Sequence, residues 1–312
     1  MQTYKIAISG ELGSGKSSLS KLLCEKINFK VLSVGTIQRK LAEKHGMSTV
    51  EFNTYMETHP EIDIECDNKV IEYGLSDANL ILDSRMAWHF VPHAFKIHLL
   101  VNIHIAADRI FNDNVRKNEQ NSDIEHTVQN IISRKASEVK RFKEQYNANI
   151  DDLQNYDIVV DSSHILPEDL AAFILERFEN WKLHKNFNRM WLSPKNLFPL
   201  QGIREHGMRY TREIKKSIEV NGFNETEPIQ VIQQNGLYFI YNGHKRCTSS
   251  ISSGLDLVPV DILNQKIHQL PNGQSFADYV KDHYNIANVY DWEDKNGFKF
   301  ASYIKKYRYD LL

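Results

Sequence analysis

The stretch that most constrains this chain is GELGSGKSS, Gly10–Ser18, which fits the pattern GxxxxGK[ST]. Its glycines allow backbone N–H groups to turn inward and cradle phosphate oxygens at the start of a helix. The motif follows the apolar run YKIAIS and precedes the amphipathic segment KSSLSKLLCEKI. It therefore lies between a predicted strand and a predicted helix, which is the context that a phosphate-binding loop requires.

Within this loop, Lys16 is expected to reach the β- and γ-phosphates of a nucleotide, and the Ser17 hydroxyl to hold Mg²⁺. We accordingly expect ATP and Mg²⁺ as cofactors. The residues expected to bind the nucleotide are Gly10, Gly13, Ser14, Gly15, Lys16, Ser17 and Ser18.

Residues 1–181 alternate strand-like and helix-like segments. Continuous apolar runs, typical of buried parallel strands, are ANLILD, KIHLLV and YDIVVD. Helical patterns separate them, and the longest is the charged segment HTVQNIISRKASEVKRFKEQY. This alternation predicts an α/β fold with a doubly wound parallel sheet, whose ligands lie at the carboxyl ends of the strands.

A phosphate-binding loop alone fits kinases, GTPases and motor ATPases. No NKxD-type guanine motif follows the loop, and no extended DExx segment is present, so a GTPase and an ATP-driven machine are both disfavoured. Asp83 instead ends the buried run LILD, where a carboxylate can hold Mg²⁺ or an acceptor hydroxyl, and Arg85 follows it. A simple turn carboxylate is the alternative interpretation of Asp83.

A kinase must also shield the transferred phosphoryl group from water and neutralise its charge, usually with arginines on a closing lid. Candidates are Arg109 and Arg116 on one helical segment and Arg134 and Arg141 on the next. The last two are seven residues apart and share a helix face, with Glu138 between them. For any single arginine, a solvated surface position is the simpler interpretation; the cluster favours a lid.

Several segments resemble the archaeal-type cytidylate kinases over about residues 4–175: SVGTIQRKLAEKHGMSTVEFNTYMETHPEIDIECD, LILDSR and SRKASEVKRFKEQYNANIDDLQNYDIVVDSS. Such enzymes move the γ-phosphoryl group of ATP to CMP or dCMP. The resemblance implies an acceptor site formed by Ser33, Gly35, Arg39, Asp63 and Arg85. It also implies a catalytic set of Lys16, Asp83, Arg134 and Arg141. This chain has Asp83-Ser84-Arg85 where the family commonly has EGR or DGR.

The segment 182–195 interrupts the α/β pattern, and we expect it to be a linker between residues 1–181 and a smaller α+β domain over 196–312. The second domain contains the run PIQVIQQNGLYFIYNGHKRCTSSISSGLDLVPVDIL, which resembles the ParB/sulfiredoxin-like fold. In that superfamily the GHxR turn binds nucleotide or phosphate. The resemblance implies a second anion site, which comprises Asn242, Gly243, His244, Lys245 and Arg246.

Asn242 stands where this superfamily usually has Asp. An amide carries no negative charge and is a poor proton acceptor, so a binding role is favoured over a second catalytic centre. Residues 189–312 hold 16 Lys and Arg against 13 Asp and Glu, which is only a weak indication of an anionic ligand.

The whole chain has 312 residues and a formal net charge of −2, which gives no general attraction to nucleic acid or anionic lipid. Its three cysteines are scattered without a CxxC pair, which disfavours a zinc site or a disulfide framework and favours a reducing cytoplasm. No apolar run is long enough for a membrane helix, and no signal-peptide pattern precedes the loop.

Three functions remain open from the sequence. The first is a kinase that phosphorylates free CMP or dCMP and carries an accessory nucleotide-binding domain. The second is a kinase that acts on a modified pyrimidine, such as hydroxymethyl-pyrimidine, within DNA held by the second domain. The third is a nucleotide sensor in which neither domain turns over. The oligomeric state is not predicted.

Overall fold

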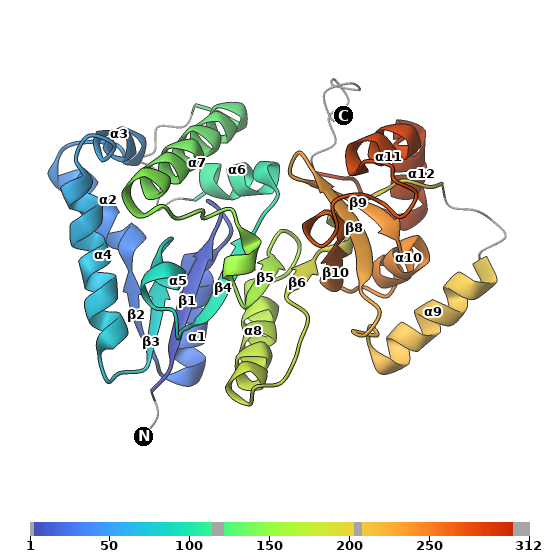
Figure 1. The fold of residues 1–312 in the computed structure, drawn as a ribbon, viewed down its shortest axis with the longest axis horizontal. Helices are drawn as coiled ribbons and strands as arrows, with labels where there is room; N and C mark the ends of the chain where they lie inside the picture. Colours follow the sequence, from blue (N-terminus) through green and yellow to red (C-terminus); the bar gives the residue numbers. More distant parts are fainter. Residues whose placement is uncertain (1–2, 114–121, 203–207, 302–312) are drawn as a thin grey trace. The chain divides into compact units, whose positions relative to one another are not determined.

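In a computed structural model the chain forms two compact units, Met1–Arg189 and Met190–Leu312 (Figure 1). The structure describes residues 3–113, 122–202 and 208–301. The division falls inside the segment 182–195, where we expected a linker, and strand β6 (Met190–Leu192) forms within that segment.

The first unit contains a sheet in the order β2-β3-β1-β4-β5, and its neighbouring strands are parallel. These strands are β1 (Lys5–Gly10), β2 (Lys30–Ser33), β3 (Leu80–Asp83), β4 (Phe95–Leu100) and β5 (Ile158–Asp161). The chain places β2 and β3 on one side of β1 and then returns to add β4 and β5 on the other. This is the doubly wound arrangement, and the predicted parallel α/β sheet is confirmed.

Eight α-helices of the first unit connect and cover these strands within its described residues (Figure 1). They are α1 (Lys16–Ile27), α2 (Val34–Lys44), α3 (Thr49–Tyr55), α4 (Pro60–Leu75), α5 (Ala87–Phe90), α6 (Ile103–Phe111), α7 (Ile124–Tyr146) and α8 (Pro167–Lys182). Helix α1 packs against α8, and α6 packs against α7. Fully buried side chains of β1, β3 and β4, such as Ile8, Ile81 and Ile97, form the core beneath them.

Helix α4 has no counterpart among the predicted elements. The helix before it, α3, begins with a capping box in which Ser48 and Glu51 satisfy each other's backbone N–H groups. That helix ends at Tyr55, and α4 then begins at Pro60, whose fixed φ suits the first position of a helix.

The second unit contains a mixed sheet in the order β6-β10-β8-β9-β7. Its other elements are β7 (Leu197–Pro199), α9 (Met208–Asn221), β8 (Ile229–Gln234), β9 (Leu237–Asn242), α10 (His244–Ser252), β10 (Val258–Ile262), α11 (Phe276–His283) and α12 (Ile286–Asn296). Strands β8 and β9 pair antiparallel as a hairpin, and β10 runs parallel to β8. The unit is thus α+β, as expected from the change in sequence pattern.

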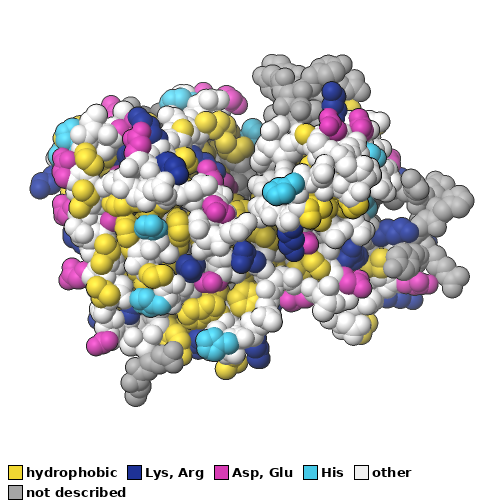
Figure 2. All heavy atoms as spheres, in the orientation of Figure 1, with side chains coloured by type: hydrophobic (Ala, Val, Ile, Leu, Met, Phe, Trp, Pro, Cys, Tyr) yellow, Lys and Arg dark blue, Asp and Glu magenta, His cyan; other side chains and the backbone are white. Residues whose placement is uncertain are grey.

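Lysine and arginine side chains are interspersed with acidic ones over the face of the molecule seen in Figure 2. Across the described ranges, every helix is too short or too polar to cross a bilayer.

Candidate active site

A cavity of about 590 Å³ lies in the first unit, where its parallel strands end. Its lining includes the loop after β1, Asp83 at the end of β3 and the segment Ser162–Leu166 after β5. Helices α2, α4, α6 and α7 supply the remaining walls. In open parallel sheets this carboxyl edge is where ligands bind.

The phosphate-binding loop is held tightly against the strand and helix beside it. Gly10 has φ +147°, and a Cβ there would lie 2.5 Å from the Leu99 carbonyl oxygen. Gly13 has φ +75°, and a Cβ there would lie 2.8 Å from the Ala106 Cβ. Only glycine fits both positions, so the close turn that exposes backbone N–H groups depends on these two residues.

The side chain of Lys16 folds back over this loop. Its Nζ donates to the carbonyl oxygens of Gly10 at 2.8 Å and Glu11 at 2.9 Å. Helix α1 begins at Lys16, so the free N–H groups of its first turn point at the same space. A nucleotide phosphate entering here meets both the ammonium group and the helix start.

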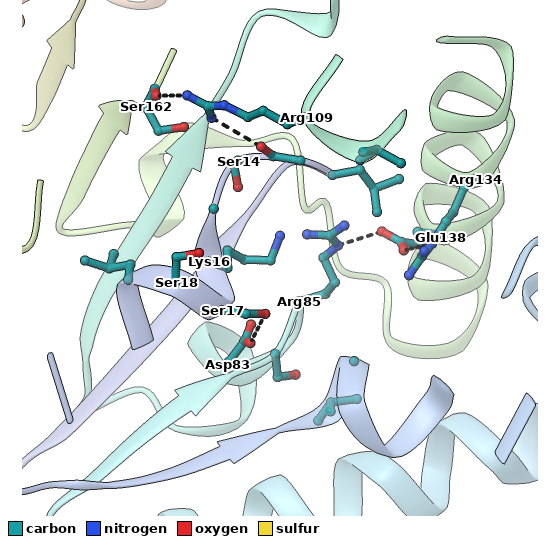
Figure 3. A pocket seen from close by; sticks show the side chains of 18 of the residues that line it. Ser14, Lys16, Ser17, Ser18, Asp83, Arg85, Arg109, Arg134, Glu138 and Ser162 are labelled. Atoms are coloured by element: carbon teal, nitrogen blue, oxygen red, sulfur yellow. Dashed lines mark hydrogen bonds and ion pairs between the residues drawn. The ribbon is translucent and has the colours of Figure 1, made fainter. Parts of the chain in front are cut away.

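Two hydroxyl groups converge on one carboxylate oxygen beside the loop, and Figure 3 shows the contact made by Ser17. The Ser17 Oγ donates to the Asp83 Oδ2 at 3.3 Å, and the Ser33 Oγ donates to the same atom at 3.0 Å. Among the described residues no group of three or more His, Cys, Asp or Glu side chains forms a cage for a metal. Mg²⁺ commonly takes one or two protein oxygens together with waters and substrate phosphates, so Ser17 and Asp83 fit this ion.

Helix α7 contributes a buried ion-pair network. The Glu138 carboxylate lies 2.6 Å from the Arg85 Nε and 3.2 Å from the Arg134 Nε (Figure 3). Burial opposes the ionisation of Glu138, but the charges of Arg85 and Arg134 outweigh it and lower its pKa to about 2. Arg85 also donates to the Gly10 carbonyl oxygen. The network therefore orients two cationic groups at the cavity and ties one of them to the loop.

Arg141, one turn further along α7, contacts side chains of α3 and α4. Its Nη1 lies 2.6 Å from the Asp63 Oδ2, and its Nη2 donates to the Asn53 Oδ1 at 3.0 Å. The side chains of Arg141 and Asp63 are only 5% and 3% exposed. We predicted both as site residues without predicting that they form a pair.

Asp67 is a cavity residue that sequence reasoning missed. The Tyr146 hydroxyl donates to its Oδ2 at 2.7 Å, and burial raises the pKa of Asp67 to about 7. Its spacing of four residues from Asp63 on α4 was the available signal, because such residues share a helix face.

Arg109 links the loop after β1 to the loop after β5 (Figure 3). Its guanidinium group donates to the carbonyl oxygens of Gly13 at 3.3 Å, Ser162 at 2.8 Å and Ser163 at 3.1 Å. The Ser162–Leu166 segment lines the cavity and was also missed, since no motif marks it. Arg116 lies outside the described residues.

The cavity brings together most of the predicted site of the first unit. Among the described candidates, those that line it are Gly13, Ser14, Gly15, Lys16, Ser17, Ser18, Gly35, Arg39, Asp63, Asp83, Arg85, Arg109, Arg134 and Arg141. Gly10, at the start of the loop, does not line this cavity. Ser33 does not line it either, but its hydroxyl group donates to Asp83, which does. Arg39 donates to the Thr36 Oγ1 at 3.1 Å.

In the second unit, side chains of the predicted anion site have partners within the chain. Gly243, with φ +112°, caps the start of α10. The His244 Nε2 accepts from the Leu200 N–H at 3.1 Å, and burial lowers the pKa of His244 to about 4. Arg246 donates to the carbonyl oxygens of Glu227 and Pro228. His244 is therefore neutral near pH 7, and Arg246 braces the turn before β8.

A phosphate-binding loop, a carboxylate at the end of a neighbouring strand and buried arginines around one cavity define a P-loop nucleotide kinase. A family model described as an AAA domain matches residues 6–128. The cytidylate kinase of Thermoplasma volcanium is 34% identical over 179 residues, which are 56% of this chain and 91% of that protein. The cytidylate kinase of Methanocaldococcus jannaschii is 33% identical over 182 residues, 57% of this chain and 98% of that protein.

The chain belongs to the cytidylate kinase family, and it is an ATP-dependent kinase. The S-adenosylmethionine-dependent nucleotide dehydratase of Lacinutrix mariniflava is also similar, with 33% identity over 176 residues, 56% of this chain and 36% of that protein. A solved shikimate kinase from Bacteroides thetaiotaomicron matches 56% of this chain and 98% of that chain at 14% identity and a TM-score of 0.41, which is too weak to add to the assignment.

Proposed function

We propose that the first unit transfers the γ-phosphoryl group of ATP to CMP or dCMP in the 590 Å³ cavity. The observation that carries this proposal is the convergence of the phosphate-binding loop with a buried Asp63–Arg141 pair and Asp67 in one cavity. The similarity to cytidylate kinases supports it.

The donor half of the cavity is suited to the triphosphate. The backbone of the loop and the Lys16 ammonium group bind the β- and γ-phosphates, and in doing so Lys16 leaves the carbonyl oxygens that it contacts here. Ser17 and Asp83 would hold Mg²⁺, which would supply positive charge against the negative charge that develops during transfer. Arg109 and the Ser162–Leu166 loop border the remaining donor space.

The arginines then serve the transfer itself. Arg85 and Arg134 are held by Glu138 at the side of the loop that faces the acceptor region. Such positioned cations bind the acceptor phosphate and stabilise the charge on the transferred group without rearranging during the reaction.

The acceptor half of the cavity carries groups that match a cytosine ring. Cytosine offers an amino group, which donates, and ring carbonyl and nitrogen atoms, which accept. The Asp67 and Asp63 carboxyl groups accept hydrogen bonds, and the Arg141 guanidinium group donates them. Uracil replaces the amino group by a carbonyl oxygen and would place a second acceptor against a buried carboxyl group, which is costly.

For the second unit, we propose a role in binding a nucleotide or nucleic acid rather than catalysis, on the likeness of its YNGHKRC turn to the ParB/sulfiredoxin-like fold. Asn242 and Lys245 are the groups at this turn best placed to meet a ligand, because both lie at exposed positions, whereas His244 and Arg246 are partly buried. A cytoplasmic location fits this proposal.

The test is to incubate the full chain and [γ-³²P]ATP with separate panels of nucleoside monophosphates and of DNA containing hydroxymethyl-pyrimidines. Label in CDP or dCDP is the expected result. Label that stays with the DNA would replace the proposal by the kinase of modified DNA. Tight ATP binding with no labelled acceptor would replace it by a nucleotide sensor.

A further inference from the structure

A second cavity, of about 390 Å³, lies in the first unit on the other side of the phosphate-binding loop. It is bordered by the loop, the end of β4 and the facing sides of α6 and α7. Leu12, Arg85 and Glu138 line both cavities and form the partition between them. The apolar residues of its lining are Leu12, Val101, Ile103, Ala106, Ile131, Ile132, Ala136, Val139 and Ile150.

His98, on β4, contributes a polar group to this apolar lining. The residue is 7% exposed, and its Nδ1 is buried without a hydrogen-bond partner among the described residues. Its ring lies 4.5 Å from the Tyr156 ring. Burial, with the nearby charges of Lys16 and Arg85, lowers the pKa of His98 well below its usual range, so the imidazole is neutral and offers one donor and one acceptor. Because this Nδ1 has no accessible surface, a ligand in the cavity would meet the part of the His98 side chain that lines it.

The charged groups around the cavity compensate one another. Arg85 is paired with Glu138 at 2.6 Å. Lys135 lies 3.2 Å from a Glu11 carboxylate oxygen and 3.1 Å from one of Asp151. Each of these five groups thus has an opposite charge within 3.2 Å, and the apolar walls would oppose burying a new charge.

We propose that this cavity binds an uncharged heteroaromatic ring, of the size of an indole or a nucleobase, with a polar edge toward His98. Cavities of this size, with apolar walls and a few convergent polar groups, are typical small-molecule sites. A flat ring satisfies the apolar contacts with α6 and α7, and its polar edge can contact the imidazole where that ring lines the cavity. This site is separate from the proposed kinase reaction, although it shares a wall with the phosphate loop.

The test measures binding of indole and of adenine to the full chain by ligand-observed NMR titration. Saturating non-hydrolysable ATP analogue is present throughout, so that neither probe occupies the donor site. The wild type is expected to bind at least one probe saturably, with a Kd of about 1 mM or below. Tighter binding of indole or of adenine identifies which kind of ring the site prefers.

Two variants locate this binding. Ala136→Phe fills the cavity from an exposed position of α7 and is expected to weaken probe binding about tenfold or more. His98→Phe keeps the ring shape but removes the polar edge, and it is expected to weaken binding about fivefold or more. Both should retain affinity for the ATP analogue, which reports an intact donor site.

The proposal is overturned if neither probe binds the wild type saturably, or if Ala136→Phe binds the probes as well as the wild type does. Should Ala136→Phe not fold, Ile132→Trp fills the same wall from a position that is 48% exposed.

Discussion

At the scale of single residues, Asp67 is the side chain proposed to distinguish cytosine from uracil. Replacing it by Asn leaves a group that can present its amide N–H groups to a uracil carbonyl oxygen, so discrimination between the two bases should fall. We predict that Asp67→Asn lowers the ratio of kcat/KM for CMP over UMP by about 10- to 100-fold. Steady-state assays with the two acceptors measure this ratio directly.

The matched control is Glu65→Gln, two residues away on α4 at an exposed position. It removes a carboxylate from the same helix without touching the cavity, and the CMP preference should stay as in the wild type. An unchanged preference in Asp67→Asn would remove Asp67 from the specificity proposal.

Asp67 also predicts a pH dependence of stability. Burial raises its folded pKa to about 7 from an ordinary value of 3.8, so the folded state keeps this proton where the unfolded chain has lost it. The free energy of unfolding should therefore decrease as pH rises from about 4 to about 7, by about 4 kcal/mol, because each pKa unit between the two states is worth about 1.4 kcal/mol. Below that interval both states hold the proton, and above it both have lost it.

Urea unfolding at pH 4.5 and pH 7.5, compared between the wild type and Asp67→Asn, measures this contribution. The fall in unfolding free energy between the two pH values should be smaller in the variant. An identical pH dependence in both proteins would show that Asp67 ionises normally in the folded state.

At the scale of elements, α7 organises the cationic side of the cavity. Glu138 holds Arg85 and Arg134 while itself buried, and removing one member of a buried ionic group leaves its partners uncompensated. We predict that Glu138→Gln lowers the free energy of unfolding by about 3 kcal/mol. It should also lower kcat by about tenfold or more, because both guanidinium groups lose their orientation.

Glu144→Gln is the control for this prediction, since Glu144 lies on the same helix at an exposed position. Urea denaturation and kcat are measured on both variants. The comparison distinguishes loss of the Glu138 ion-pair network from a general effect of removing an acidic charge. Equal losses in the two variants would contradict the role given to Glu138.

Helix α7 also shows what a sequence can and cannot predict about this site. The seven-residue spacing of Arg134 and Arg141, with Glu138 between them, was sufficient to predict one helix face. The partners on the other side of the cavity are Arg85, 53 residues from Glu138, and Asp63, 78 residues from Arg141. Such pairs depend on how α4 and the β3 end are placed by the fold, and no local pattern encodes them.

At the scale of the whole molecule, the parallel sheet of the first unit followed from the alternation of apolar runs and helical patterns. The second unit was recognisable as α+β, but the environment of its GHKR turn was not. His244 and Arg246 contact Leu200 and Glu227, at separations of 44 and 19 residues. From the residue types alone, both side chains were expected to donate hydrogen bonds to a bound anion. In the fold they contact the backbone of Leu200 and Glu227.

The division into two units gives a prediction about where catalysis occurs. The donor and acceptor groups proposed for the reaction all belong to the first unit. Asn242→Ala and Lys245→Ala, which alter exposed positions of the second unit, should therefore change kcat/KM for free CMP by less than about twofold. A tenfold loss in either variant would place part of the reaction in the second unit.

The central claim is that Lys16 and the cavity around it transfer the γ-phosphoryl group of ATP to CMP. The most direct measurement compares formation of labelled CDP from [γ-³²P]ATP and CMP by the wild type, Lys16→Ala and Lys26→Ala, an exposed lysine on the same helix. The account predicts labelled CDP from the wild type and from Lys26→Ala, and none above background from Lys16→Ala. Labelled CDP from Lys16→Ala at the wild-type rate, or none from the wild type, would contradict it.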